Sequence, residues 1–175
     1  MKIAILGYMG VGKSFIGKYL SKILNFNFYD LDKCIEYKYN ISVKKIFYKY
    51  GENQFRFIET NILNIFLKKK KNIILSLGGG TPCYNNNINF LKKNFITIYL
   101  SANILFIYKR LIIEKKKRPI INKINNVNFK KFLFKHINKR KNIYKKSLIK
   151  IKIKNNNYKY ITKNIFYNIK KYVKL

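Results

Sequence analysis

The segment Gly7–Ser14 has the residue types that bind the phosphates of a nucleoside triphosphate. Its sequence, GYMGVGKS, matches the G-x-x-x-x-G-K-[ST] pattern of a phosphate-binding loop. The glycines let backbone N–H groups turn toward phosphate oxygens, and the start of the following helix adds partial positive charge. In such a loop Lys13 contacts the β- and γ-phosphates, and the hydroxyl of Ser14 ligates Mg²⁺. The segment therefore predicts a triphosphate site and leaves the phosphate acceptor open.

Two carboxylates, Asp30 and Asp32, follow the next apolar run of the chain. We expect 26–29 to be a strand, and ligands of a parallel sheet lie at the carboxyl ends of its strands. Alternation along an extended segment would place both carboxylates on one side. One of them would then hold Mg²⁺ through water, and the other would orient or deprotonate a hydroxyl. The alternative role for Asp32 is to cap the helix that follows it.

A third cluster lies in residues 51–59, which read GENQFRFIE. Arg56 and Glu59 are three residues apart on a predicted helix, so their side chains are close enough to pair. A surface salt bridge is one interpretation, and such a pair would contribute little to stability. The functional interpretation is an arginine that Glu59 holds toward an anionic group of the substrate.

Three consecutive glycines end another predicted strand in the segment Ser76–Gly80, SLGGG. They permit close approach of other groups to the backbone, and they permit positive φ angles. A plain turn is the other interpretation. Two further arginines follow: Arg118 precedes Pro119, and Arg140 comes four residues before Tyr144.

The composition of the chain sets its arginines apart. Its 175 residues include 39 Lys and Arg against 6 Asp and Glu, which gives a net charge of +33, yet only four of the basic residues are arginine. A nucleic-acid surface favours arginine, so the excess of Lys, Asn, Ile, Phe and Tyr is interpreted as the bias of an AT-rich genome. We expect no specific nucleic-acid partner. A basic nucleic-acid-binding protein with a vestigial phosphate loop is the alternative from another class.

The elements that must position these residues alternate between strands and helices. Short apolar runs predict buried strands, and apolar residues at helical spacing predict helices. This alternation predicts an α/β fold, with helices on both faces of an open parallel sheet. A polar loop is expected at 115–128. Strands are expected at 2–6, 26–29, 72–77, 95–100 and 149–153, and helices at 13–24, 42–49, 53–67, 102–114, 128–146 and 160–172.

Several classes of protein are excluded by the sequence. No uncharged apolar run approaches about 18 residues, so no transmembrane helix is expected. The apolar run Ile3–Leu6 is too short for a signal peptide, and a cytoplasmic protein is expected. Cys34 and Cys83 give neither a disulfide framework nor a metal site. His136 is expected on the surface of a helix.

Together these motifs resemble one family, the shikimate kinases. The phosphate loop, D-x-D, G-E-x-x-F-R-x-x-E, S-L-G-G-G, R-P-I-I and R-x-x-x-Y follow one another in the family's order, from Lys2 to about Tyr144. The resemblance implies transfer of the γ-phosphoryl group of ATP to the 3-hydroxyl of shikimate. It implies a three-layer P-loop kinase fold with a five-stranded parallel sheet, formed by a single domain over residues 1–175. Gluconate-type and nucleoside monophosphate kinases are the nearest alternatives.

The resemblance also implies the parts of the site. A substrate-binding region is expected at about 33–61, a lid at about 112–126, and a monomer without a membrane partner. Catalytic roles fall to Asp32, which is expected to act as the base, and to Lys13 and Arg118. Residues 152–157 match the family's adenine loop loosely, so no adenine contact is assigned there. Shikimate is expected at Asp32, Arg56, Gly79, Gly80 and Arg140, ATP at Gly10, Val11, Gly12, Lys13, Ser14, Phe15, Arg110 and Arg118, and the Mg²⁺ cofactor at Ser14 and Asp30.

Overall fold

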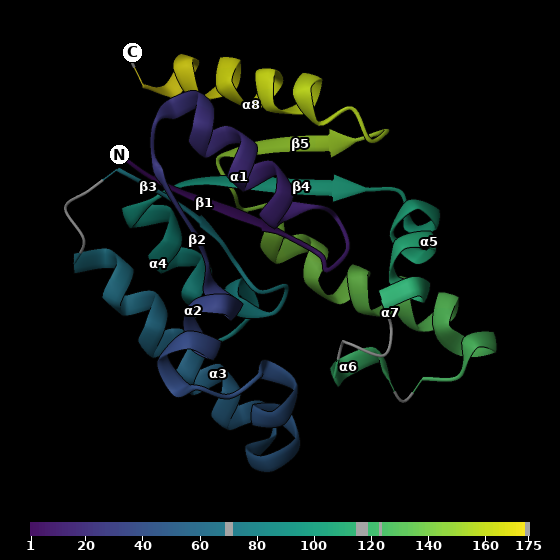
Figure 1. The fold of residues 1–175 in the computed structure, drawn as a ribbon. Coiled ribbons are helices and arrows are strands. Elements are labelled where there is room, and N and C mark those ends of the chain that lie inside the picture. The colour runs from purple at the N-terminus through teal and green to yellow at the C-terminus, as the bar shows by residue number, and fades with distance from the viewer. Residues whose placement is uncertain (69–71, 115–118, 123, 174–175) are drawn as a thin grey trace.

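The computed structural model describes residues 1–68, 72–114, 119–122 and 124–173. Within these ranges a single parallel sheet has the strand order β2-β3-β1-β4-β5 (Figure 1). The strands are β1 (Lys2–Gly7), β2 (Asn27–Asp30), β3 (Ile73–Ser76), β4 (Ile96–Ala102) and β5 (Ile149–Ile153). The predicted strands are confirmed, with ends that shift by one or two residues.

Helices cover both faces of this sheet, which confirms the three-layer α/β fold (Figure 1). The helices α1 (Lys13–Leu24) and α8 (Tyr158–Tyr172) pack against each other on one face. The opposite face is covered by α2 (Leu31–Tyr39), α3 (Val43–Lys68) and α4 (Asn87–Asn94). Next to the carboxyl ends of β1 and β4 lie α5 (Ile104–Glu114), α6 (Pro119–Asn122) and α7 (Asn126–Tyr144).

Side-chain alternation along β1 divides the core between the two faces. Ile3 and Ile5 are buried against α1 and α8, whereas Ala4 and Leu6 are buried against α2–α4. A parallel strand covered on both faces needs an uninterrupted apolar sequence, which is why 3–6 contains no polar residue. A third cluster joins the phosphate loop to α5–α7, and its buried members are Tyr8, Met9, Tyr99, Ile107, Leu111, Ile121, Phe129, Leu133 and Tyr144.

The helix α3 contains the break that the sequence predicts at Gly51. This residue has φ 75° and ψ 176°, a conformation that glycine adopts at little cost, and helix continues on both sides of it. The kink separates a first segment near α2 from a second segment that carries Arg56 and Glu59.

Three short helices were not predicted: α4, α6 and the 3₁₀ turn η1 (Thr81–Cys83). They contain 8, 4 and 3 residues, which is too few for an apolar repeat to emerge from the sequence. The expectation of a loop throughout 115–128 was wrong, because α6 and the start of α7 fall within it. Among the described residues, no helix is long and apolar enough to cross a membrane.

Candidate functional site

The predicted phosphate loop connects β1 to α1 and has the required backbone conformation. Gly7, Gly10 and Gly12 have φ angles of 144°, 79° and 98°, values that residues with a side chain rarely adopt. The ammonium group of Lys13 donates to the backbone carbonyl oxygens of Gly7 at 3.0 Å and of Tyr8 at 3.2 Å. The lysine therefore lies back over its own loop, at the start of α1.

A cavity of about 450 Å³ opens beside this loop. Arg110 lines its far side and donates to the carbonyl oxygen of Gly10 at 3.1 Å, to Asn156 Oδ1 at 2.6 Å, and to the Tyr158 hydroxyl. The rings of Phe15 and Tyr158 lie 4.3 Å apart between centroids, so the cavity has an aromatic wall. The predicted nucleotide residues that line it are Gly10, Gly12, Lys13, Ser14, Phe15 and Arg110, whereas Val11 is buried beneath the loop.

Asn156 and Tyr158 are site residues that the sequence analysis missed. Both contact Arg110, and Tyr158 lines the cavity directly. The available signal was an aromatic residue directly after an asparagine run, which is weak in a chain so rich in both types. The other predicted nucleotide residue, Arg118, lies outside the described residues, as do 115–117 and 123 of the predicted lid.

Three oxygen-bearing side chains gather where α1 begins. The Ser14 hydroxyl donates to Asp30 Oδ2, and its oxygen lies 3.3 Å from the hydroxyl oxygen of Ser76. Asp30 also caps α2 through its other oxygen, which accepts from the Lys33 backbone N–H at 3.4 Å. Carboxylate and hydroxyl oxygens are the ligands that Mg²⁺ takes in phosphate sites. The residues present therefore fit a magnesium ion next to the phosphate loop.

Asp32 lies at the site, but on a different element from the one predicted. The strand β2 ends at Asp30, and Asp32 lies in the first turn of α2, so strand alternation does not align the two carboxylates. The capping residue of α2 is Asp30, which leaves Asp32 available for other contacts. Its Oδ1 atom is buried and has no hydrogen-bond partner among the described residues.

The pKa of Asp32 is raised from 3.8 to about 7. Burial is the main cause, and the negative charges of Glu59 and Asp30 act in the same direction. Lys13 and Arg56 oppose the shift without cancelling it. A carboxyl group with this pKa exchanges protons readily near neutral pH, which is the property a general base requires.

Arg56 and Glu59 form a buried ion pair, so the surface interpretation of this pair was wrong. Their side chains are 4% and 1% exposed, and Nη1 of Arg56 lies 2.7 Å from Oε2 of Glu59. Glu52 accepts from Nε and Nη2 of the same guanidinium at 3.2 and 2.9 Å, and the Thr81 hydroxyl donates to Glu59. The arginine is thus fixed by two carboxylates in a low-dielectric position.

The glycines at 78–80 allow other side chains to lie close to the backbone. They are not needed for positive φ angles, since none of the three has a left-handed backbone. A Cβ atom on Gly78 would lie 3.0 Å from Oδ1 of Asp32, and one on Gly80 would overlap the guanidinium of Arg56. A larger residue at Gly78 or Gly80 would therefore displace a charged side chain of the site.

A second cavity, of about 740 Å³, adjoins the first. Arg140 of α7 contributes to it, is 8% exposed, and has an Nη1 atom with no hydrogen-bond partner among the described residues. The cavity therefore contains a buried cationic donor and a buried carboxylate oxygen, Oδ1 of Asp32, and neither has a partner within the described ranges. The predicted acceptor residues Asp32, Arg56, Gly79, Gly80 and Arg140 all line it.

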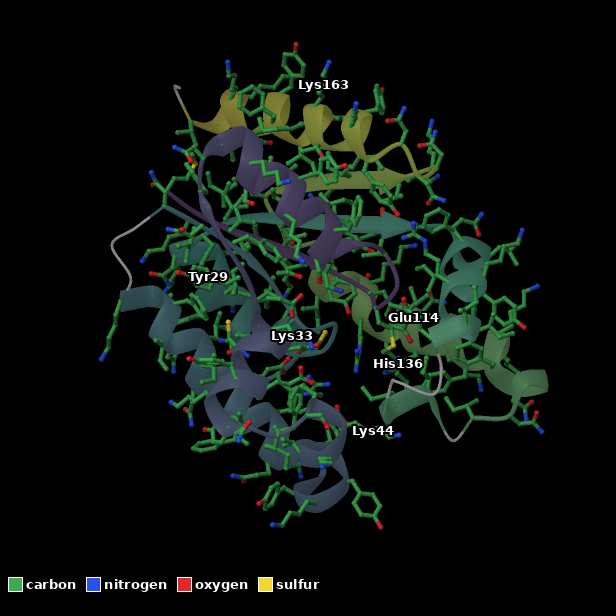
Figure 2. The ribbon with its side chains drawn as sticks, in the orientation of Figure 1. Tyr29, Lys33, Lys44, Glu114, His136 and Lys163 are labelled. Atoms are coloured by element: carbon green, nitrogen blue, oxygen red, sulfur yellow. The ribbon has the colours of Figure 1, made fainter. Side chains whose placement is uncertain are left out.

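The side walls of this second cavity come from separate elements. Lys33 of α2 and Lys44 of α3 lie on one side, and Glu114 at the end of α5 lies on the other (Figure 2). His136 on α7 is also labelled there, and its expected surface position was wrong because it is half-buried and bonded to the phosphate loop. The two cavities share Met9, Ser14, Asp30, Asp32, Gly78, Gly79 and Glu114.

Comparisons with known proteins agree with this geometry. The family model described as "Shikimate kinase" matches residues 9–171. The shikimate kinase of Flavobacterium johnsoniae is 43% identical over 155 residues, which is 88% of this chain and 90% of that protein. The crystal structure of shikimate kinase from Bacteroides thetaiotaomicron covers 100% of this chain and 99% of its own, with 28% identity and a TM-score of 0.88. The Acinetobacter baumannii enzyme in complex with shikimate has 29% identity, a TM-score of 0.89, and coverage of 96% and 92%.

Proposed function

The chain belongs to the shikimate kinase family, and we propose that its two adjoining cavities hold ATP and shikimate for direct phosphoryl transfer between them. The reaction transfers the γ-phosphoryl group of ATP to the 3-hydroxyl of shikimate and releases ADP and shikimate 3-phosphate. One observation carries the assignment of residues: in the second cavity, Nη1 of Arg140 and Oδ1 of Asp32 have no hydrogen-bond partner in the described part of the chain. These two groups match the carboxylate and the hydroxyl of shikimate.

The first cavity would take the nucleotide. Backbone N–H groups of Gly10–Ser14 would hold the phosphates, and Lys13 would leave the carbonyls of its own loop for the β- and γ-phosphate oxygens. The base of ATP would lie against Arg110, Phe15 and Tyr158, because this wall is the aromatic part of the cavity. Val11 would contribute its backbone N–H only, since its side chain is buried beneath the loop.

The second cavity would take shikimate. Arg140 and Arg56 would pair with its carboxylate, for which the planar guanidinium is better suited than lysine. The backbone N–H groups of Gly79 and Gly80, which line this cavity, would donate hydrogen bonds to the substrate. Asp32 would accept a hydrogen bond from the 3-hydroxyl, at the point where both cavities meet.

The mechanism then depends on position and charge. Asp32 would take the proton of the 3-hydroxyl as that oxygen attacks the γ-phosphorus, and the raised pKa matches this task. Lys13, and Arg118 by its motif, would neutralise the negative charge on the transferring phosphoryl oxygens. Ser14 and Asp30 would hold Mg²⁺, which supplies charge neutralisation at the β- and γ-phosphates when bound.

We also propose the larger organisation that the family pattern implies. The chain would act as a single domain and a monomer, with α2 and the first part of α3 forming the substrate-binding region at about 33–61. The region at about 112–126 would close over the substrates as a lid and exclude water during transfer.

The experiment that tests the function is ADP release from Mg·ATP by the purified protein. Shikimate, gluconate and AMP are offered as acceptors at a salt concentration high enough to remove bound nucleic acid, which a chain of charge +33 attracts. We expect turnover with shikimate alone and its loss in the Arg140→Ala variant. Turnover with gluconate or AMP in place of shikimate would refute the assignment.

The Ser14→Ala variant tests the proposed metal site. Loss of the hydroxyl removes one proposed ligand and frees Asp30 from its hydrogen bond, so the Mg²⁺ concentration at half-maximal rate should rise about tenfold or more. The measurement is the rate at fixed ATP and shikimate over a Mg²⁺ titration, with complete loss of turnover in excess EDTA. Ser42→Ala is the matched control, because Ser42 lines the second cavity away from the phosphate loop. An unchanged Mg²⁺ dependence in Ser14→Ala would contradict the site.

A further inference from the structure

The phosphate loop is joined to α7 by a partly buried hydrogen bond between two side chains. Tyr8 is the second residue of the loop and is only 2% exposed. Its hydroxyl lies 2.6 Å from Nδ1 of His136, and the two rings meet edge to face at 5.5 Å between centroids. The residues are 128 positions apart in sequence, so this contact is made by the fold and not by local structure.

At its other end, Tyr8 is part of the machinery that holds Lys13. The backbone carbonyl oxygen of Tyr8 accepts from the ammonium group of Lys13 at 3.2 Å and from the Val11 backbone N–H at 3.3 Å. The position of the Tyr8 backbone therefore affects both the turn of the loop and the place of its lysine.

On α7, His136 lies one helical turn before Arg140, and Tyr144 lies one turn after it. Phe132, one turn earlier, stacks on the imidazole at 4.9 Å with an angle of 28° between the ring planes. The Tyr144 hydroxyl donates to the backbone carbonyl oxygen of Gly79. Arg140 thus lies between two residues that fix α7: His136, which bonds to the phosphate loop, and Tyr144, which bonds to Gly79.

The low pKa of the imidazole makes it neutral at physiological pH, and the tautomer then decides whether Nδ1 accepts from the Tyr8 hydroxyl or donates to it. Its pKa is lowered to about 4, mainly by burial and then by the positive charge of Arg140. Lys139 and Arg56 act in the same direction, and Glu52 opposes them. A neutral ring with its proton on Nε2 leaves Nδ1 free to accept from the Tyr8 hydroxyl.

We propose that Tyr8 and His136 are positioning residues that set Arg140 of α7 relative to the phosphate loop. The inference rests on the proposed role of Arg140 in binding the shikimate carboxylate. Tyr8 holds Lys13, which lines the first cavity, and His136 lies one turn from Arg140, which lines the second cavity. The bond fixes the distance between the two groups before either substrate arrives.

The Tyr8→Phe variant removes the hydroxyl and keeps the buried ring. We expect kcat/KM for shikimate to fall about three- to tenfold, mostly through a higher KM, which is the size of one buried hydrogen bond. The KM for ATP should change less than about twofold, because the phosphates themselves fix the loop when bound. Tyr99→Phe is the matched control, since Tyr99 belongs to the same apolar cluster and its ring packs on Tyr144. Equal effects of both variants on the shikimate KM would overturn the proposal.

Changes at His136 test the same bond from the other side. His136→Leu should reproduce the Tyr8→Phe kinetics, and the double variant should be no worse than either single one, because all three lose the same bond. His136→Asn keeps an acceptor oxygen near the position of Nδ1 and should recover part of the loss. Additive losses in the double variant would show that the two residues act separately and would refute the pair.

A spectroscopic measurement tests the bond independently of turnover. His136 is the one histidine of the chain, so a ¹⁵N spectrum contains a single imidazole. The wild-type protein should show the Nε2–H tautomer and a pKa well below 6.5, and Tyr8→Phe should change the ¹⁵N shift of Nδ1 while the pKa stays low, because burial and Arg140 lower it. If the ¹⁵N signals of His136 are the same in Tyr8→Phe as in the wild type, the contact is refuted even if shikimate turnover is normal. If instead the imidazole responds but wild-type protein lacks shikimate turnover, the proposed function fails while the contact stands.

Discussion

An Asp32→Asn enzyme is expected to lose about 10²- to 10⁴-fold in kcat, the range that a general base contributes. Asparagine keeps the size of the side chain and can still contact the 3-hydroxyl of shikimate, but it cannot accept the proton. The KM for shikimate should therefore change much less than kcat. Steady-state kinetics at saturating Mg·ATP separate the two parameters.

The pH profile of the wild-type enzyme gives the same residue a second test. Because the base must be ionised, kcat/KM for shikimate should fall about tenfold per pH unit below the Asp32 pKa of about 7. This limb should be absent from the residual activity of Asp32→Asn. A wild-type profile that stays flat down to pH 5 would contradict Asp32 as the base.

Stability should move in the opposite direction to activity. The folded-state pKa of about 7 lies above the ordinary 3.8, so the folded protein binds more protons than the unfolded chain between these values. The free energy of unfolding therefore falls as pH rises through this window, and Asp32→Asn should be more stable than the wild type at pH 8. Glu36→Gln is the control, since Glu36 lines the same cavity but its charge pairs with Lys33 at 2.7 Å. Thermal unfolding of both variants at pH 5 and pH 8 provides the comparison.

The two arginines of the acceptor cavity should respond differently to replacement by methionine. Arg140→Met should raise the shikimate KM at least about 30-fold, from the roughly 2 kcal/mol lower limit for losing one partner of a buried charged contact. Without shikimate, this variant should lose much less stability than Arg56→Met, because Arg140 forms no ion pair among the described residues and hydrogen-bonds only the neutral side chain of Tyr144 there.

Arg56→Met should lose substrate affinity and stability together. It would leave Glu59 as a buried carboxylate without its cation, which costs about 3–5 kcal/mol. Adding Glu59→Gln should recover part of that stability without restoring the shikimate KM. Urea unfolding and steady-state kinetics on the three variants give the result. Equal destabilisation by Arg140→Met and Arg56→Met would mean that both arginines are structural.

Most of the fold followed from local patterns in the sequence. The alternating strand Ile149–Ile153 and the helical spacing of Lys13–Leu24 were predicted with the observed bounds, since packing and local preference agree there. The kink at Gly51 was likewise visible in sequence. The short helix α4 was not, because it covers apolar surface without completing a recognisable period.

The site was predicted unevenly, and the reason is burial. Asp32, Arg56 and Arg140 could be identified as candidates from their residue types. Sequence spacing cannot distinguish a surface ion pair from the buried pair of Arg56 and Glu59. Spacing also gave the wrong reason for Asp32, which a helix and not a strand brings to the cavity. The contact between Tyr8 and His136 joins distant parts of the chain, so no local pattern contains it.

The wall that both cavities share has a consequence for inhibitor design. Residues such as Ser14, Asp32 and Gly79 border both spaces, so the two binding volumes meet at these residues. A single compound that joins an adenosine phosphate to a carboxylate-bearing ring can occupy both volumes at once. Its second half then binds at the high effective concentration set by the linker, and its affinity exceeds that of either half. The linker must be short and polar, since it would pass between Lys13 and Asp32.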